Sequence, residues 1–311
     1  MGFTLESDKS GAKLAIHQGS VMKSIVLIVN FIMMSLFTVW FPSFAMVVFL
    51  VLVILIGMPH GALDLWILRK RFAISTFKTT VLFIAYLSLA IAVFLGFYWF
   101  SSFFFGIFLL YSAYHFGMDY YDSSVFQTKV YCYFLAFIIG LSIICLPALL
   151  HTQKICVLFS YLIGSEQAML YAHFLQWAAC CLLPVIGLGL FTLKKDCAQE
   201  VVIVLMAAFL TPPLAFLTVY FVGIHSCKYF AMLYEKIGYS SYRTFVKDLL
   251  PMTLLTYTFS ITAYAFLPST LDWQGAGFFL TIYMLASLTL PHLILVEVFK
   301  KKEVCYGDYL H

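Results

Sequence analysis

The sequence has 311 residues, of which 63% are hydrophobic and 10% are charged, with a formal net charge of +4. An ordinary soluble domain has about 25% charged residues, so this composition excludes a soluble enzyme and indicates an integral membrane protein. The lysines and arginines are spread over the expected loops, which argues against nucleic-acid binding and favours a role in membrane orientation.

Apolar segments long enough to cross a bilayer follow one another along nearly the whole chain. We predict an all-α fold, a polytopic transmembrane helical bundle of about 8 to 10 helices, since each crossing needs about 20 residues. Residues 21–300 are expected to form this single domain, between polar tails over 1–20 and 301–311. The first apolar run lacks a cleavage pattern, so an uncleaved helix is expected there. The expected helices cover residues 21–40, 44–68, 79–98, 103–121, 130–150, 168–193, 201–233, 249–267 and 278–299.

The apolar run over residues 201–233 contains Pro212 and Pro213, which a continuous helix does not tolerate without a kink. If this run crossed the membrane only once, the basic loops that follow it would lie on the outer side of the membrane. Basic loops are expected on the cytoplasmic side, as for residues 69–71, so a single crossing conflicts with the charge distribution. One extra crossing or re-entrant turn between Lys194 and Pro213 removes the conflict. We therefore predict a turn or sharp break at the two prolines, with both termini cytoplasmic and the protein in the cell membrane.

The second expected helix contains Gly57-Met58-Pro59-His60-Gly61-Ala62-Leu63-Asp64. An acidic side chain near the bilayer centre is disfavoured by roughly 2.5–3.5 kcal/mol on insertion scales, so it needs a partner. His60 and Asp64 are four residues apart, which places them on one face of an α-helix and would let Asp64 accept the spare ring N–H of His60. The fourth expected helix repeats this spacing with His115 and Asp119.

Two more histidines, His225 and His292, lie on later helices, and the predicted topology puts all four at a similar depth. Bundle proteins build metal sites from side chains on facing helices, and nitrogen ligands without cysteine suit iron, copper or zinc. We therefore predict a metal site at these histidines. The remaining histidines are expected in the tails, an outer loop or an interfacial position: His17, His311, His151 and His173.

The eight cysteines form no C-x-x-C pair and are expected to act as small apolar side chains. They are Cys132, Cys145, Cys156, Cys180, Cys181, Cys197, Cys227 and Cys305.

The motifs around these histidines resemble those of the Brp/Blh family, the bacteriorhodopsin-related-protein-like β-carotene 15,15′-dioxygenases. The resemblance implies a membrane-embedded non-haem Fe(II) enzyme that uses O₂ to cleave the central double bond of β-carotene into two all-trans-retinal molecules. It also implies iron ligation by His60, His115 and His225. The matching motifs, in the family's order, are G-x-P-H-G-x-x-D over residues 57–64, Tyr114-His115-Phe116-Gly117, His225-Ser226 followed by Lys228, and Pro291-His292.

The chain departs from the family pattern at Tyr229, where the family has a second histidine proposed as an iron ligand. A tyrosinate binds ferric iron but is a poor replacement for imidazole on Fe(II). His292 then completes the ligand set, or three histidines suffice, or the activity has changed. The alternatives to catalysis are a non-catalytic or altered-specificity carotenoid- or retinoid-binding membrane protein and a transporter.

Two other functional classes fit less well. A haem-binding electron carrier also uses histidines on facing helices, but it does not call for the nearby acids. A membrane desaturase would show H-x-x-x-H or H-x-x-H-H boxes, and neither occurs in the sequence. Retinal bound as a Schiff base would need a lysine inside a helix, and Lys228 is the one lysine expected near the site.

A polyene substrate needs a long apolar tunnel, and the 33 phenylalanines and 20 tyrosines of the chain supply lining residues. We expect the lining to include the aromatic residues nearest the histidines. Addition of O₂ across a double bond needs no reductant, in agreement with the lack of a dinucleotide-binding fingerprint in the sequence. The expected lining residues are Tyr111, Tyr114, Phe116 and Phe221.

Overall fold

The computed structural model describes residues 22, 24–64, 75–121, 129–267 and 269–307, and the regular structure in these ranges is entirely helical. The predicted all-α fold is therefore confirmed for this part of the chain. The polar tail predicted over residues 1–20 and the basic residues 69–71 lie outside the described residues. At the other end, the last helix continues to Gly307, past the predicted boundary at residue 300.

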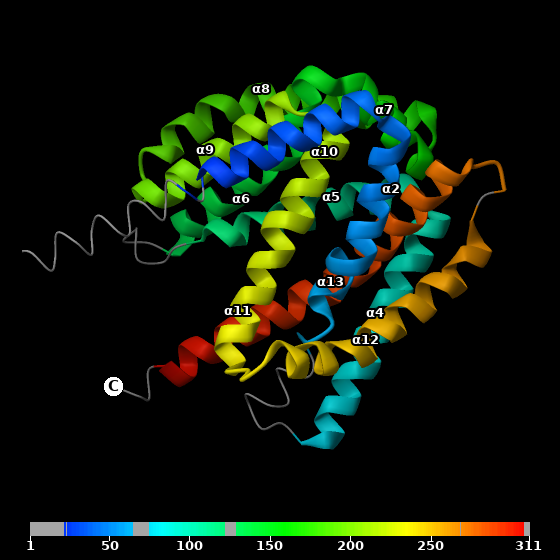
Figure 1. Ribbon diagram of the computed structural model, residues 1–311, viewed down its shortest axis with the longest axis vertical. Coiled ribbons are helices and arrows are strands. Elements are labelled where there is room, and N and C mark those ends of the chain that lie inside the picture. Colours follow the sequence, from blue (N-terminus) through cyan, green and yellow to red (C-terminus); the bar gives the residue numbers. More distant parts are fainter. Residues whose placement is uncertain (1–21, 23, 65–74, 122–128, 268, 308–311) are drawn as a thin grey trace, which may run out of the picture.

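Where the connections lie within the described residues, the helices follow one another closely (Figure 1). Two of them pass without a break into π-helical stretches, in which the backbone turn is wider than in an α-helix: α2 continues into η1 (Val53–Gly57) and α10 into η4 (Thr218–Ser226). A helix over Ser24–Trp40 comes first. The α-helices after it are α2 (Pro42–Leu52), α4 (Thr76–Trp99), α5 (Ser101–Gly117), α6 (Lys129–Cys145), α7 (Pro147–Ile163), α8 (Ser165–Leu190), α9 (Lys195–Leu210), α10 (Pro213–Leu217), α11 (Cys227–Ile237), α12 (Tyr242–Ala263) and α13 (Trp273–Gly307).

Six helical segments in the described ranges are long and apolar enough to cross a membrane, or seven if the bent pair α6–α7 is one span. The chain is thus a multi-pass membrane protein. This count is below the predicted 8 to 10 because three expected crossings have 17 residues or fewer, short of the roughly 20 that a span needs. These three are Ser24–Trp40, α5 and α9.

Two of the breaks between helices lie at prolines. The predicted break at Pro212 is confirmed, since α9 ends at Leu210, Thr211 is extended with φ −91° and ψ 151°, and α10 begins at Pro213. The predicted continuous helix over 130–150 is wrong, because α6 ends at Cys145 and α7 begins at Pro147 with a bend of 54°. Proline has no N–H to continue the hydrogen-bond ladder of the preceding helix, which explains both breaks.

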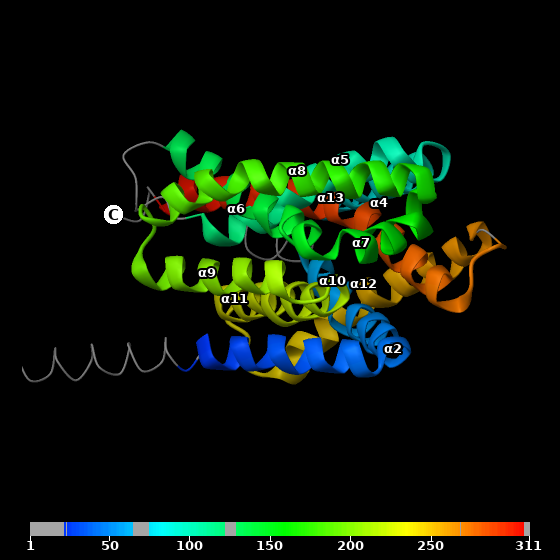
Figure 2. The ribbon, with the colours of Figure 1, turned by 90° about the horizontal axis from the view of Figure 1, so that it is seen from above.

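The helices pack in layers (Figure 2). The helix Ser24–Trp40 lies on the opposite side of α9 from α8, and its Phe31 ring stacks on Phe216 of α10 with 5.9 Å between ring centroids. In Figure 1, α10, η4 and α11 form one continuous rod through the middle of the molecule, and α13 crosses behind it. Large apolar side chains on the outer faces, such as Trp177 and Phe191, are exposed, as expected where lipid is the solvent.

Candidate metal centre

His60 sits where the second helix loses its regular α-helical geometry. The π-helix η1 ends at Gly57, and a 3₁₀ turn, η2 (Pro59–Gly61), carries the histidine. In this turn the Nδ1–H group of His60 donates a hydrogen bond to the carbonyl oxygen of Gly57. The contact fixes the ring so that its other nitrogen, Nε2, faces the interior, where it is buried without a hydrogen-bond partner among the described residues.

The other three histidines come from three other helices and meet His60 in the interior. His115 lies near the end of α5, His225 in the π-helix η4, and His292 directly after Pro291 in α13. All four are buried, with at most 7% of each residue exposed. The ring centroid of His292 is 4.9 Å from that of His60 and 5.1 Å from that of His115, and His225 is 4.6 Å from His115. The four predicted positions are therefore brought together.

The carboxylates orient histidines of other helices. Asp64 Oδ2 accepts a hydrogen bond from Nδ1 of His292 at 2.5 Å, and Asp119 Oδ2 accepts one from Nδ1 of His225 at 2.7 Å. Histidine ligands of metals usually have such a carboxylate or carbonyl partner on the second ring nitrogen, because it fixes the tautomer and the ring orientation. The carbonyl of Gly57 has the same function for His60.

The predicted pairing of Asp64 with His60, four residues away, is therefore wrong. The prediction assumed a regular α-helix over residues 60–64, whereas the chain there leaves a π-helix and forms a 3₁₀ turn. The same assumption fails for Asp119, because α5 ends at Gly117 and a 3₁₀ turn, η3 (Met118–Tyr120), follows. Both turns redirect the carboxylate to a histidine that is distant in sequence.

The donor set fits a metal ion. Ligand atoms of His60, His115 and His292 lie within 4.8 Å of one another, and His225 adjoins this group. The Nε2 atoms of His60, His225 and His292 are buried and have no hydrogen-bond partner in the described part of the chain. Buried polar atoms are almost always paired, so these unpaired imidazole nitrogens are the donors that a metal ion would bind.

Two glycines of the His60 motif are required by close packing. A β-carbon at Gly61 would lie 3.1 Å from His292 Nδ1, and one at Gly57 would lie 2.6 Å from a ring carbon of Phe221. Gly61 thus leaves room for the ring of His292, and Gly57 lets the π-helices η1 and η4 approach each other. Neither glycine has a positive φ angle, so contact rather than backbone conformation explains them.

Tyr229 contacts the carboxylate of Asp64. Its hydroxyl donates a hydrogen bond to Asp64 Oδ1 at 2.7 Å, and its ring centroid lies 5.1 Å from that of His292. Asp64 therefore holds Tyr229 with one oxygen and His292 with the other. The phenol that stands in place of the family's histidine is part of the support of the histidine cluster.

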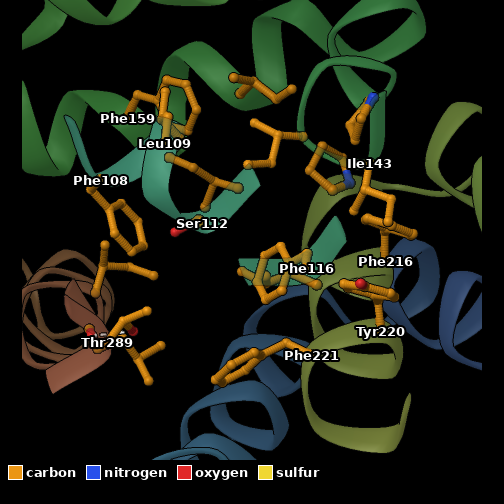
Figure 3. Close-up of a pocket in the computed structure, with 18 of the residues that line it drawn as sticks. Phe108, Leu109, Ser112, Phe116, Ile143, Phe159, Phe216, Tyr220, Phe221 and Thr289 are labelled. Carbon is orange, nitrogen blue, oxygen red and sulfur yellow. Dashed lines mark hydrogen bonds between the residues drawn. The ribbon is translucent and has the colours of Figure 1, made fainter. Parts of the chain in front are cut away.

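An apolar cavity of about 1070 Å³ extends from the cluster (Figure 3). His60 and His115 form part of its wall, and most of the rest consists of aromatic and aliphatic side chains from α5, α7, α10, η4 and α13. Figure 3 shows Phe221 and Thr289 on opposite sides of the open space.

The comparison with known proteins agrees with this geometry. A family model described as β-carotene 15,15′-dioxygenase matches residues 51–300, which include all four histidines of the cluster. The chain belongs to the β-carotene 15,15′-dioxygenase family. A relative from an uncultured marine bacterium, itself named β-carotene 15,15′-dioxygenase, is 30% identical over 258 residues that cover 80% of this chain and 91% of the relative. No solved structure matches the chain.

The lining predicted for this family member is partly confirmed. Phe116 and Phe221 line the cavity, but Tyr111 and Tyr114 do not. The hydroxyl of Tyr111 instead donates to the carbonyl oxygen of Ala286 at 2.6 Å. The hydroxyl of Tyr257 makes the same kind of bond, to Ile54 of the π-helix η1, also at 2.6 Å. These tyrosines bond backbone carbonyl groups of α13 and η1, a role that no sequence pattern indicated.

One lysine and two further histidines of this dioxygenase family member lie outside the histidine cluster. Lys228 pairs with Glu200 and lies over the ring of Tyr120, 5.2 Å from its centroid, with 42% of its side chain exposed. His151 approaches the carbonyl oxygen of Leu210 at 3.4 Å, and His173 is exposed. The sequence excluded these two histidines from the site. His17 and His311 lie outside the described residues.

Proposed function

We propose that the chain is a membrane-embedded non-haem iron dioxygenase that cleaves the central 15,15′ double bond of β-carotene with O₂ into two molecules of all-trans-retinal. The main support is the buried group of imidazoles at the wall of a large apolar cavity. Membership of the family supports the choice of substrate and reaction.

Fe(II) is the proposed metal, with His60, His115 and His292 as ligands and His225 as the fourth. Neutral imidazoles suit Fe(II), and the cluster has no cysteine that would favour a softer metal. Bound there, the metal would activate O₂ for reaction with the polyene. Gly57, Asp64 and Asp119 would keep the ring nitrogens in the required tautomer, because each accepts the Nδ1–H of one imidazole.

The residues of the cavity wall would bind and orient the substrate. The apolar side chains exclude water and bind the polyene by dispersion and by removal of its surface from water. One C=C bond is broken and two C=O bonds form, one for each oxygen atom of O₂, so the reaction balances without a reductant. The chain then needs to supply orientation and a dry site rather than a second cofactor.

The proposed location is the cell membrane, with both termini in the cytoplasm. β-Carotene dissolves in the bilayer and would enter the cavity from the lipid. The exposed apolar side chains on the outer helical faces support a surface surrounded by lipid.

The test is expression in bacteria that accumulate β-carotene, with chromatography of β-carotene and retinal. We expect retinal from the natural chain, none from His60→Ala, and unchanged yield from the matched control His173→Ala, whose side chain is exposed. Iron in the purified natural protein, and its loss in His60→Ala, would identify the metal. Intact β-carotene with a folded, iron-loaded natural protein would refute the proposal.

A further inference from the structure

Ser112 places a hydroxyl group in the wall of the apolar cavity. It lies on the face of α5 that lines the cavity, where lining residues recur every three or four positions along the helix. Only 4% of the serine is exposed. The other lining residues on this face are aromatic or aliphatic, apart from one candidate metal ligand: Phe105, Phe108, Leu109, His115 and Phe116. Ser112 thus interrupts a hydrocarbon surface one helical turn before His115.

The hydroxyl of Ser112 faces the cavity and not its own helix. Buried helical serines often donate to the carbonyl oxygen four residues earlier, as Ser142 and Ser287 do here at 2.8 and 2.6 Å. Ser112 makes neither this bond nor another within the described residues. Figure 3 shows its oxygen at the edge of the open space. A buried polar group without a partner is uncommon in proteins, so this hydroxyl indicates a ligand that supplies the partner.

The other hydroxyls of the cavity wall are used elsewhere. Thr289 donates to a carbonyl oxygen of its own helix at 2.6 Å. The hydroxyl oxygen of Tyr220 is fully buried beside Tyr120 and has no surface toward the cavity. Within the described wall, Ser112 is therefore the hydroxyl that can donate a hydrogen bond into the open space.

The two proposed ligands of the cavity differ in what they offer such a donor. β-Carotene is a hydrocarbon and has no acceptor. Retinal carries an aldehyde, whose oxygen accepts hydrogen bonds and cannot donate one. Cleavage at the histidines creates this aldehyde beside them, and Ser112 is about 4.5 Å along the helix axis from His115, at 1.5 Å per residue. The donor therefore lies where the acceptor first appears.

We propose that Ser112 donates a hydrogen bond to the aldehyde oxygen of retinal and so retains one product molecule in the cavity after cleavage. The proposal rests on the proposed function and assigns a product-binding residue to it. The hydrocarbon substrate gains nothing from this hydroxyl, so substrate and product are held by different contacts. Retinal is then an inhibitor that competes with β-carotene for the cavity.

Ser112→Ala tests the proposal, because it removes the hydroxyl and adds no bulk. The matched control is Ser142→Ala, which removes a buried serine hydroxyl that bonds its own helix. The full-length protein in detergent is titrated without O₂ with all-trans-retinal and, separately, with β-carotene. The affinity for each pigment and the C=O stretching frequency of bound retinal are measured. Both pigments are added from outside, so the binding measurement does not depend on catalysis.

We expect Ser112→Ala to bind retinal about tenfold more weakly, the effect of losing one hydrogen bond in a dry site. The C=O band of bound retinal should move to higher frequency, because a hydrogen bond lowers it. Affinity for β-carotene should stay the same, and Ser142→Ala should change neither pigment. Unchanged retinal affinity with an unchanged C=O band, or equal weakening for both pigments, would overturn the role of Ser112. Failure of the proposed function is recognised separately, as the absence of retinal formation from β-carotene when O₂ is present.

Discussion

Tyr229 and His292 are held by the two oxygens of one carboxylate, that of Asp64. The phenol donates to Oδ1 at 2.7 Å and the imidazole to Oδ2 at 2.5 Å. A second donor on the carboxylate keeps it fixed and buried, and thereby fixes the ring of His292. The position at which the chain departs from the family pattern is therefore connected to the cluster through a hydrogen bond.

Removal of this phenol hydroxyl should weaken metal binding. In Tyr229→Phe, Asp64 loses one donor and His292 loses its rigid support, so we expect metal affinity to fall about 10- to 100-fold, as for other outer partners of metal ligands. Metal titration of the purified protein measures this. Tyr257→Phe is the control, since it removes a similar hydroxyl that bonds a backbone carbonyl instead. Equal affinity in Tyr229→Phe and the natural protein would show that the bond has no such role.

The two carboxylates should differ in importance. Asp64 has 3% of its side chain exposed and serves two partners, whereas the side chain of Asp119 is 21% exposed, so that water can replace part of its contact. We expect Asp64→Asn to lose more metal affinity than Asp119→Asn, within the range of about 10- to 100-fold. Iron content and retinal yield of the two variants, compared at equal protein amounts, check this order. A larger loss in Asp119→Asn would contradict it.

A methyl group at Gly61 should disturb the cluster. The added β-carbon would lie 3.1 Å from His292 Nδ1, which is tighter than an ordinary contact, so the ring must shift by a few tenths of an ångström. We expect Gly61→Ala to bind metal about tenfold more weakly or worse, since the bond between His292 and Asp64 is lost or distorted. Gly223→Ala is the matched control, because a β-carbon there meets no atom within 4 Å. Iron content measured for both variants in detergent would separate a local effect from general sensitivity to alanine.

Lys228 should be dispensable for catalysis. Its ammonium group pairs with Glu200 on the surface of α9, and exposed pairs of this kind contribute about 0–1 kcal/mol to stability. We expect Lys228→Ala to retain retinal formation and to unfold at nearly the same temperature as the natural protein. Borohydride treatment during turnover gives a second measurement: a covalent retinal adduct on the natural chain that disappears in Lys228→Ala would reveal a Schiff base instead.

Much of the fold could be predicted from the sequence, because the length of an apolar run and the position of a proline both affect the local helix. The runs of apolar residues predicted the helices, and the missing N–H of proline predicted the break before Pro213. The break at Pro147 was not predicted, since nothing in the surrounding apolar residues distinguished it from a tolerated kink. Helix lengths below a full span were also missed, because apolar composition does not define where a helix ends.

The cluster itself was predictable, but its internal contacts were not. Four buried histidines on different helices indicated one site, and they do meet. The partners of Asp64 and Asp119 depend on whether the local turn is α, 3₁₀ or π, and the sequence contains no sign of that choice. The shape of the apolar cavity depends on how helices from distant parts of the chain pack together, and no local sequence pattern predicts that packing.

The sequence separation of 228 between Asp64 and His292 has a consequence for biosynthesis. Chains are made from the amino terminus, so α2 and Asp64, which follows η2, are made well before α13 exists. Until then the carboxylate lacks the imidazole that it binds in the folded chain, and an unpaired acid in hydrocarbon is costly. A chain that stops before His292 therefore loses more than its last helix. Asp64 is then left without this partner, and cellular proteolysis should remove such fragments before they can bind a metal ion.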